Sequence, residues 1–390
     1  MAERIAVGID VGTYQVRVVV AKHDSAEHTF PKIIGTGYAE SKGLRHGYIV
    51  NIDDVSRSVR IAVQQAEKVA GIKVRDAFLA IGGIGLDEVR SRGETIIARA
   101  DAEVTDLDIE KAVDTAREHA QTRLVNRRIL HTIPLSYTID GVEVLGRPQG
   151  MKGTKLAADV MYITCLEQHV TDMVDAVEAA NIAVVDVMAA PLAGSIVSLS
   201  PSEKKAGCVL ANIGAETVSV VVFDNGIPIS VKVFKIGSMD ITKDIALGLR
   251  ISLDEAEQLK LGAITHTTYP KKKLDDILAA RLTDIFELID NHLKKLGRNQ
   301  LLPAGIILTG GGSGIGPVKD IATESLRLHS KTASLSIAPD AKMRDASWMV
   351  AYGLTIWGLT GADGVAGPAL KAAASHLGRS IGAFFKQFLP

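Results

Sequence analysis

Two short glycine-containing segments, one near the start of the chain and one past its midpoint, share a single pattern. In each, an apolar run leads into Asp or Asn, then any residue and Gly, with Thr close behind and a β-branched run after it; the segments span 7–21 and 209–223. Glycine lets the backbone turn sharply and approach a ligand closely, which a Cβ would block. Consecutive amides in such a turn form a concavity that attracts anions. One such hairpin in each half of the chain could therefore grip the phosphates of one nucleotide from both sides.

A third glycine segment follows an apolar run at 306–309 and precedes an expected helix from about 317. It consists of Gly310, Gly311, Gly312 and Ser313, and it suits flat packing against an adenine or a ribose. A single glycine hairpin is most often only a tight turn. Three in this order are more specific, and they resemble the phosphate-1, phosphate-2 and adenosine motifs of the actin, sugar-kinase and heat-shock-chaperone superfamily. That resemblance implies an α/β actin-like ATPase fold, with two lobes built on ribonuclease-H-like subdomains.

Composition narrows the class of protein. A length of 390 residues suggests two or three domains. With 47% hydrophobic residues and a mean hydropathy of +0.18, a large core is readily built. The 44 Lys and Arg balance 45 Asp and Glu, which argues against a nucleic-acid partner because such proteins usually carry a basic excess. Cys165 and Cys208 both lie in apolar segments, which fits a reducing cytosol and not a disulfide framework.

No targeting or membrane-spanning segment is expected. The first residues lead straight into an apolar strand pattern, without the charged and apolar regions of a secretory signal. No uninterrupted apolar stretch reaches the ~18–20 residues that a spanning helix needs. The nearest candidate, 348–359, is short and contains two glycines, so we expect a buried core helix there.

Apolar spacing and turn residues predict the order of elements. A hairpin is expected over 1–25, extended chain over 40–51, a helix over 55–70 and a strand and turn over 78–83. The region 84–162 reads as an inserted small domain with a strand at 94–98, a helix at 106–120 and a strand at 128–133. A helix over 166–180, a strand at 184–187 and a crossing helix at 191–199 should follow. The second half should hold strands at 208–213, 218–223 and 229–236 and helices at 253–261 and 271–296.

Several longer phrases sharpen the resemblance. The segments 129–137 and 148–156 within the expected insert, together with 41–47, 240–246 and 255–260, are similar to the bacterial cell-division FtsA family. The similarity runs from Ile5 to about Leu359 and includes the small insert. It implies a protein that binds ATP with Mg²⁺, forms actin-like filaments with itself, and ties FtsZ polymers to the cytoplasmic face of the cell membrane as a peripheral protein. The implied division is 1–83 and 163–207 for the first lobe, 84–162 for the insert, 208–360 for the second lobe with a small subdomain at about 238–303, 361–370 for a linker, and 371–390 for a terminal helix.

The resemblance also implies a nucleotide site, residue by residue. Asp10, Gly12, Thr13 and Tyr14 would face the phosphates, with Asp10 holding the waters of Mg²⁺. The other side would be closed by Asn212, Gly214, Ala215 and Thr217. Glu257 and Lys260 would approach the ribose and adenine from a helix, although a solvated helix face is the other interpretation of this pair. Gly310, Gly311, Gly312 and Ser313 would line the base.

The chain departs from that family pattern at the second phosphate loop. Asn212 stands where Asp is usual, Ala215 and Glu216 replace glycines, and Ala190 stands at a position that is acidic in some relatives. Mg²⁺ prefers charged oxygen ligands, and phosphoryl transfer depends on that charge and on a positioned water. We therefore predict ATP binding with at most weak hydrolysis. Steady-state turnover well above ~1 s⁻¹, an ordinary kinase rate, would contradict this prediction.

The last residues predict a membrane-binding helix after a Gly/Pro-containing linker. Apolar residues recur at steps of three and four, basic residues flank them, and no acid is present over 371–390. Such a helix suits the plane of an anionic membrane. A helix docked on its own domain is the other interpretation. The residues expected to touch lipid are Leu377, Ile381, Phe384, Phe385, Lys386 and Phe388.

Partner binding is expected at the end of the long helix, where cations suit the acidic C-terminal tail of FtsZ. The candidates are Lys294, Lys295, Arg298 and Asn299, and an ordinary solvated helix end explains them equally well. Two other functions stay open. A PilM-like platform of type IV pilus assembly is suggested by 213–215 and 251–257, and a sugar or acetate kinase would need a catalytic base that the sequence does not clearly offer.

Overall fold

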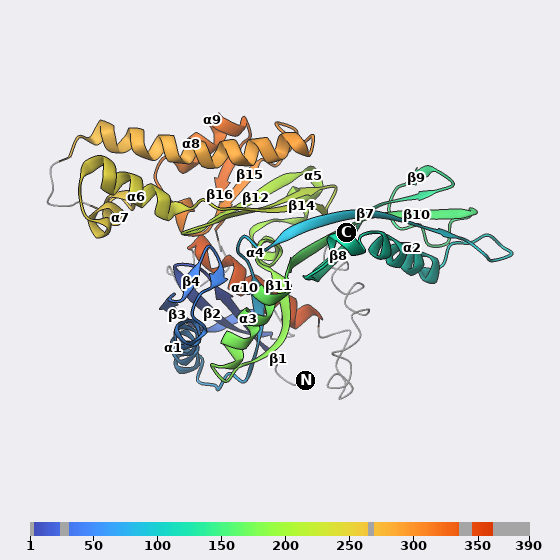
Figure 1. Cartoon of the computed structure of the whole chain (residues 1–390), viewed down its shortest axis with the longest axis horizontal. Coiled ribbons are helices and arrows are strands. Elements are labelled where there is room, and N and C mark those ends of the chain that lie inside the picture. The colour runs from blue at the N-terminus through green and yellow to red at the C-terminus, as the bar shows by residue number, and fades with distance from the viewer. Residues whose placement is uncertain (1–3, 24–30, 264–268, 335–344, 362–390) are drawn as a thin grey trace.

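The computed structural model of the chain describes residues 4–23, 31–263, 269–334 and 345–361. Three main β-sheets, each covered by helices, make up the molecule (Figure 1). We call the part around the first sheet lobe 1, the part around the third sheet lobe 2, and the part around the second sheet the insert. A two-stranded ribbon of β4 (Leu44–Arg45) and β5 (Tyr48–Ile49) belongs to lobe 1.

The sheet of lobe 1 has the order β11-β6-β1-β2-β3. Strands β1, β2 and β3 pair antiparallel, and β6 and then β11 add in parallel on the other side of β1. The strands are β1 (Arg4–Val11), β2 (Gln15–His23), β3 (Lys32–Glu40), β6 (Asp76–Ile81) and β11 (Ala183–Ala189). The middle residues of β1 and β2 form continuous buried runs, as expected for strands covered by helices on two faces. The expected hairpin over the first residues is confirmed for the described part.

Lobe 2 repeats the same arrangement with the order β14-β13-β12-β15-β16. Three antiparallel strands are followed by two parallel ones, so β12 takes the place that β1 has in lobe 1. The strands are β12 (Cys208–Ile213), β13 (Val218–Asp224), β14 (Ile227–Phe234), β15 (Ile306–Thr309) and β16 (Ser330–Thr332). The two glycine segments of the sequence therefore connect equivalent strands in the two lobes.

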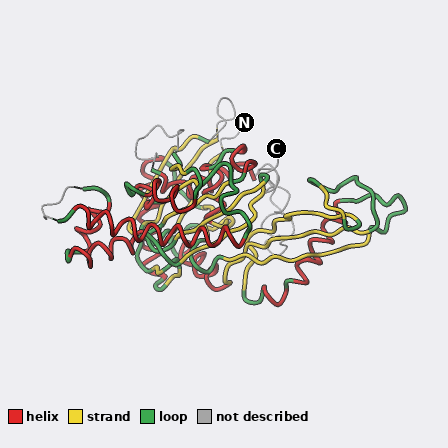
Figure 2. Tube along the Cα trace, turned by 90° about the horizontal axis from the view of Figure 1, so that it is seen from above, coloured by secondary structure: helices red, strands yellow, loops and turns green. Residues whose placement is uncertain are grey.

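The insert is a four-stranded antiparallel sheet, ordered β7-β10-β8-β9, with one helix across it. Its elements are β7 (Asp87–Ile96), α2 (Asp106–His119), η1 (Gln121–Arg123), β8 (Arg127–Ile139), β9 (Val142–Val144) and β10 (Lys155–Leu166). The strands run outward from the two lobes, with α2 alongside (Figure 2). The predicted strand at 94–98 is wrong in its bounds, because the ladder with β10 begins at Asp87 and ends at Ile96. The predicted strand at 128–133 continues to Ile139 for the same reason.

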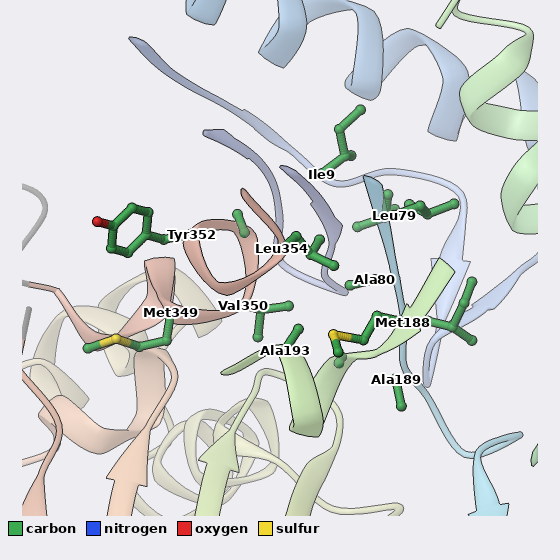
Figure 3. Packing of buried hydrophobic residues seen from close by; sticks show 14 of the residues in the cluster. Ile9, Leu79, Ala80, Met188, Ala189, Ala193, Met349, Val350, Tyr352 and Leu354 are labelled. Carbon is green, nitrogen blue, oxygen red and sulfur yellow. The ribbon is translucent and has the colours of Figure 1, made fainter. Parts of the chain in front are cut away.

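The two lobes meet through a pair of apolar helices, α4 (Ala190–Ser198) and α10 (Met349–Gly361). One hydrophobic core runs from the sheet of lobe 1 through these helices to Leu210 and Phe223 in lobe 2. Figure 3 shows Val350 and Leu354 of α10 among buried side chains of β1, β6, β11 and α4. Gly353 lies so close to the backbone carbonyl of Ala193 on α4 that a Cβ on Gly353 would overlap the carbonyl oxygen. The predicted buried helix near the end of the chain is confirmed, and no described helix is both long and apolar enough to cross a bilayer.

The remaining helices cover the outer faces, as Figure 1 shows for α8 above lobe 2. They are α1 (Ile52–Ala70) and α3 (Glu167–Glu178) on lobe 1, and α5 (Pro201–Ala206), α6 (Ser238–Leu249), α7 (Leu253–Lys260), α8 (Lys271–Lys295) and α9 (Val318–Leu326) on lobe 2. Helix α1 begins three residues before the predicted Val55, because the Asn51 side chain accepts a hydrogen bond from the Asp54 N–H. It ends at Ala70, and the following Gly71 caps it in a left-handed conformation.

Candidate functional site

The first glycine loop joins β1 to β2 through a closed turn. The N–H of Gly12 donates to the carbonyl of Gln15 at 3.2 Å. A Cβ on Gly12 would lie 2.9 Å from that oxygen, so the close approach of the two backbones requires glycine. The carbonyl of Tyr14 accepts from the N–H of Ser41, which fixes the outer side of the loop at 2.9 Å.

The second loop repeats this turn between β12 and β13. The N–H of Gly214 donates to the carbonyl of Thr217 at 2.9 Å, and a Cβ on Gly214 would lie 2.8 Å from that oxygen. The carbonyls of this loop are also held. Those of Gly214 and Ala215 accept hydrogen bonds of 2.8 Å from the first two N–H groups of α6.

Both loops leave backbone donors unused. Within the described part of the chain, no acceptor is hydrogen-bonded to the N–H of Thr13, Tyr14, Ala215 or Glu216. Tyr14 is 51% exposed, and the other three are half-buried. Unpaired backbone donors are costly when they are withdrawn from water, so a loop that presents them is suited to an anionic ligand. The structure thus gives each lobe two donors in equivalent positions.

A carboxylate and a guanidinium face each other beside the first loop. Asp10 on β1 is the cross-strand neighbour of Arg17 on β2. Burial raises the pKa of Asp10 to about 6, although the positive charge of Arg17 works in the opposite direction. Arg17 donates to Gln15 Oε1 at 3.0 Å, and its guanidinium carbon lies 5.8 Å from the centre of the Trp348 ring. Burial lowers the pKa of Arg17, which Asp10 and Asp345 counteract.

The third glycine segment packs against the second loop. Gly310 has φ of +80°, and a Cβ there would overlap Asn212 Oδ1 and lie 2.6 Å from the carbonyl of Ile213. Ser313 is buried and donates its hydroxyl to the carbonyl of Gly310 at 2.7 Å, within the short 3₁₀ turn η2 (Gly311–Gly314). The Asn212 side chain is therefore packed on this segment.

One side of the same segment is open. A Cβ built on Gly311, Gly314 or Gly316 would meet no atom within 4 Å. The N–H of Gly310 also contacts the carbonyl of Ala346 at 3.4 Å, in the turn η4 (Ala346–Trp348) that carries the tryptophan beneath Arg17. The first and third loops are thus linked, and the third presents bare backbone on one side, which suits a flat ring.

Glu257 and Lys260 on α7 bind each other. The Lys260 ammonium lies 2.7 Å from Glu257 Oε2 and also donates to Thr242 Oγ1 at 3.0 Å and to the carbonyl of Ser238 at 3.2 Å. The side chain of Lys260 is 4% exposed and that of Glu257 is 29% exposed. Burial lowers the pKa of Lys260, while Glu257 raises it. The pair joins α7 to α6, so a solvated helix face does not describe Lys260; contact of either residue with a nucleotide stays a prediction.

A residue that the sequence places in loop 2 reaches lobe 1. The carboxylate of Glu216 accepts a short hydrogen bond from the backbone N–H of His46, and its Oε2 lies 4.0 Å from His46 Nδ1. Next to His46, the backbone of Gly47 packs closely on that of Gly83. A Cβ on Gly83 would lie only 2.8 Å from the Gly47 Cα, so this contact fixes the segment. Glu216 was singled out in the sequence because glycine is usual there, but its partner lies 170 positions away and no local signal could identify it.

A second contact between the insert and lobe 2 was also missed. The carboxylate of Glu88 on β7 accepts from the N–H of Val231 at 2.7 Å, and Arg90 donates to the carbonyl of Ile229 at 2.6 Å. Both lobe 2 residues lie on the edge strand β14, so side chains of the insert satisfy its outward backbone groups. A covered edge is protected from pairing with another chain.

The cations at the end of α8 have their own partners. Lys294 lies 2.6 Å from Asp290, and Arg298 lies 2.9 Å from Asp224. Of the acids in the described residues, none lies within 4 Å of the exposed Lys295 ammonium. Asn299 is half-buried. Binding of an acidic peptide here stays a prediction, as do the lipid contacts of the terminal residues from Leu377 to Phe388, which lie outside the described residues.

Over the described ranges, no group of three or more His, Cys, Asp or Glu residues is placed to hold a metal ion. His131 is buried, and its Nε2 accepts from the N–H of Ala189 at 3.0 Å, while burial lowers its pKa to about 3. Ala190, next in the chain, begins α4 and is buried.

The architecture is that of known two-lobed proteins. The PilM protein of the solved PilM–PilN type IV pilus biogenesis complex superposes with a TM-score of 0.68 at 17% identity, covering 91% of this chain and 98% of that one. The ethanolamine utilization protein EutJ from Carboxydothermus hydrogenoformans gives 0.55 at 13% identity, over 91% and 90% of the two chains. With its duplicated sheets and paired glycine loops, the chain has the actin-like ATPase fold, as predicted.

Sequence comparison identifies the family. A model described as "Cell division protein FtsA" matches residues 209–353, and one for the "SHS2 domain inserted in FTSA" matches 86–164. Cell division protein FtsA of Pseudomonas aeruginosa is 30% identical over 342 residues, covering 82% of this chain and 81% of that protein. The Bacillus subtilis protein of the same name is 29% identical over 371 residues, covering 89% and 82%. The chain therefore belongs to the FtsA family of cell-division proteins, and the predicted resemblance is confirmed.

Proposed function

We propose that this chain binds ATP between its two lobes, polymerises into actin-like filaments, and tethers FtsZ filaments to the cytoplasmic face of the cell membrane at the division septum. Membership of the FtsA family supports the role in division. The observation that carries the nucleotide part is the repetition of one turn in both lobes, each with two N–H groups that have no acceptor among the described residues. Paired donors of this kind are suited to a polyphosphate.

The rest of the site supports a nucleotide with Mg²⁺. The open glycine side of the third loop, formed by Gly311, Gly314 and Gly316, is suited to the adenine. Asp10 is the residue that would hold Mg²⁺. One carboxylate is sufficient, because Mg²⁺ keeps several waters and takes further oxygens from the phosphates. When bound, the metal would neutralise phosphate charge.

Hydrolysis should be weak. Asn212 contributes a neutral amide that packs on Gly310, and the buried Ala190 offers no carboxylate at the start of α4. A water positioned for attack needs such an acceptor. We propose that nucleotide binding organises assembly and that turnover is slow.

Membrane attachment is assigned to the terminal residues 371–390. A single amphipathic helix of this size binds a membrane reversibly, so firm attachment requires several copies within one filament. We propose that the FtsZ tail binds at the end of α8 and just after it, at the predicted residues Lys294, Lys295, Arg298 and Asn299. Lys295 has no acid beside it among the described residues, whereas a peptide carboxylate would have to displace Asp290 from Lys294 and Asp224 from Arg298.

A PilM-like platform is the second candidate, favoured by the shared fold with the PilM of the PilM–PilN complex. That likeness is at 17% identity and speaks for the fold alone, while the sequence matches name cell-division proteins. A sugar or acetate kinase is not favoured, because burial raises the pKa of Asp10, and the other carboxylate of the two loops, that of Glu216, accepts a hydrogen bond from the His46 N–H.

Liposome co-sedimentation tests the proposal. The full chain and a version ending at Gly367 are each pelleted with vesicles containing anionic lipid, with and without ATP and with and without FtsZ. We expect the full chain alone to pellet and to bring FtsZ with it. Vesicle binding that survives the truncation would contradict the anchor. Vesicle binding that never recruits FtsZ would contradict the division role and favour the pilus platform.

A further inference from the structure

Two side chains of the insert bind the edge of the lobe 2 sheet in the way that a neighbouring strand would. Glu88 Oε2 accepts from the N–H of Val231 at 2.7 Å, and Arg90 donates to the carbonyl of Ile229 at 2.6 Å. Both backbone groups belong to β14, which has β13 on one side and no strand of its own sheet on the other. The carboxylate takes the place of a carbonyl and the guanidinium that of an N–H, so the two side chains reproduce two bonds of a β-ladder.

The charges of these side chains strengthen the contact. Arg90 Nη2 lies 3.1 Å from Glu88 Oε1, so each side chain orients the other. The Glu88 side chain is only 17% exposed, and a hydrogen bond in which one group is ionised is about twice as strong as a neutral one. The nearby pair of Lys232 and Asp87, 3.4 Å apart, is more exposed and adds little. We call the contacts of Glu88 and Arg90 with β14 the latch.

The insert that carries the latch is fixed to lobe 1. Both of its chain connections lead there, to β6 before β7 and to α3 after β10. Met161 and Ile163 at the base of β10 are fully buried in the core that also contains β1 and β6. His131 on β8 accepts the N–H of Ala189 in β11 at 3.0 Å. The insert is therefore an extension of lobe 1.

The strand that receives the latch is fixed within lobe 2. It pairs with β13 from Ile227 to Phe234. Ser230, which lies between the two residues of β14 that the latch binds, is fully buried, and its Oγ lies 2.9 Å from His292 Nε2 on α8. Figure 1 shows β7 of the insert passing β14. The latch thus joins a firmly held part of lobe 1 to a firmly held part of lobe 2.

A second attachment changes what the lobes can do. Their main connection is the apolar packing of α4 and α10, and packed helices allow domains to slide and turn by small amounts. Any such turn moves β14 relative to the insert and breaks the two charged hydrogen bonds. We propose that Glu88 and Arg90 form a latch that holds the two lobes at a fixed angle. The latch acts without a ligand, so it can be tested apart from the proposed nucleotide function.

The test compares wild type with two double variants of β7. Glu88→Ala/Arg90→Ala removes the latch. Arg92→Ala/Glu94→Ala is the matched control, because it removes the same two residue types from the same strand and likewise leaves the net charge unchanged. The control side chains bind partners within the insert, namely Asp159, Thr138 and Lys155. Both double variants keep the bond between Glu216 and His46.

The angle between the lobes is followed by pulsed electron–electron resonance on the full chain without nucleotide. Spin labels are attached to Lys68→Cys on α1 and Glu287→Cys on α8, since both positions are exposed. The native Cys165 and Cys208 are buried, so the labels react with the introduced thiols. We expect one narrow distribution of distances in wild type and in the control, and a clearly broader one without the latch. Equally narrow distributions in all three chains, or equal broadening in both double variants, would overturn the proposal.

Amide hydrogen exchange at Val231 is the second readout. Its N–H is bonded to Glu88, so exchange should become about tenfold faster or more in Glu88→Ala/Arg90→Ala, the effect of losing a hydrogen bond to a charged group. The control should exchange like wild type. Equal exchange at Val231 with and without the latch residues would show that the contact does not hold β14, and would overturn the proposal even if the distances changed.

Discussion

The loops at 10–17 and 212–219 are the same turn built twice, and they differ in the side chains that stand on it. Both close with a glycine N–H bound three residues ahead, at 3.2 Å in lobe 1 and 2.9 Å in lobe 2. Both exclude a Cβ at that glycine. Two residues before the glycine, however, lobe 1 has Asp10 and lobe 2 has Asn212, and their surroundings differ.

The difference shows that the turn and its chemistry are set independently. In lobe 1 the Asp10 carboxylate lies opposite Arg17, so this loop carries charge. In lobe 2 the Asn212 amide packs on Gly310, so this position serves packing. The loop of lobe 2 carries its charge at Glu216 instead, and this carboxylate accepts a hydrogen bond from the backbone N–H of His46 in lobe 1. One backbone design therefore supports two separate tasks.

The largest expected effect is the loss of stability when a glycine in close contact, Gly310, is replaced, compared with a glycine in open space, Gly311. Gly310→Ala places a Cβ at a positive φ against Asn212 and the Ile213 carbonyl, and should destabilise the fold by about 2–3 kcal/mol. Gly311→Ala meets no atom within 4 Å and should change stability by less than ~0.5 kcal/mol while weakening nucleotide binding. Urea unfolding measures the first and titration the second. Equal stability of the two variants would contradict the packing assigned to Gly310.

A smaller effect tests whether the two turns are equivalent. Gly12→Ala and Gly214→Ala each push a Cβ to within 3 Å of a backbone oxygen, at 2.9 Å and 2.8 Å. Each should cost about 1–2 kcal/mol of stability, and each should weaken nucleotide affinity at least about tenfold. Gly316→Ala, which is in open space, is the control. If only one of the two variants loses affinity, the loops do not grip the same ligand.

The smallest effect concerns the charge two residues before the loop glycine, where lobe 1 has Asp10 and lobe 2 has Asn212. The folded pKa of Asp10 is about 6, above its ordinary 3.8, so the folded protein binds this proton more tightly than the unfolded chain does. Ionised Asp10 therefore lowers stability, by an amount that grows from about pH 4 to about pH 6 and is constant above that. Asp10→Asn should raise the unfolding free energy by about 1 kcal/mol at pH 7.5 and by less at pH 5, while weakening Mg²⁺-dependent binding.

Thermal unfolding at several pH values measures the difference in unfolding free energy between Asp10→Asn and wild type. Asn212→Asp is the reciprocal variant, and it should lower stability at pH 7.5 because it adds a carboxylate without a facing arginine. If the difference in unfolding free energy between wild type and Asp10→Asn grows as the pH falls, the raised pKa assigned to Asp10 is contradicted.

Much of the fold could be predicted from local pattern. The β-branched runs around both loops and the helix over 271–296 have periods that only one type of element satisfies, and the continuous apolar stretch at 348–359 is too long for a strand. The bounds were least secure where pairing decides them. β7 alternates weakly and buries only Gly93, so its true span from Asp87 became clear only from its ladder with β10.

The candidate site was predictable in its glycines and not in its long-range partners. Gly12, Gly214 and Gly310 stand out in the sequence because a sharp turn after a strand needs them. The partners of Glu216 and Lys260 do not stand out. His46 offers a backbone N–H, which any residue could supply, and Lys260 reads as a solvated cation until α6 is seen to bury it.

By itself, the amino-acid sequence determined the repeated strand–turn–strand units, the family and the positions where a Cβ is excluded, because these depend on residues close together in the chain. Only the tertiary structure decided which side chains meet between the units: Asp10 with Arg17 across a hairpin, Asn212 with Gly310, and Glu216 with His46. The physical reason is that burial and charge act through space, and a residue's surroundings exist only once the sheets have paired and the lobes have closed on α4 and α10.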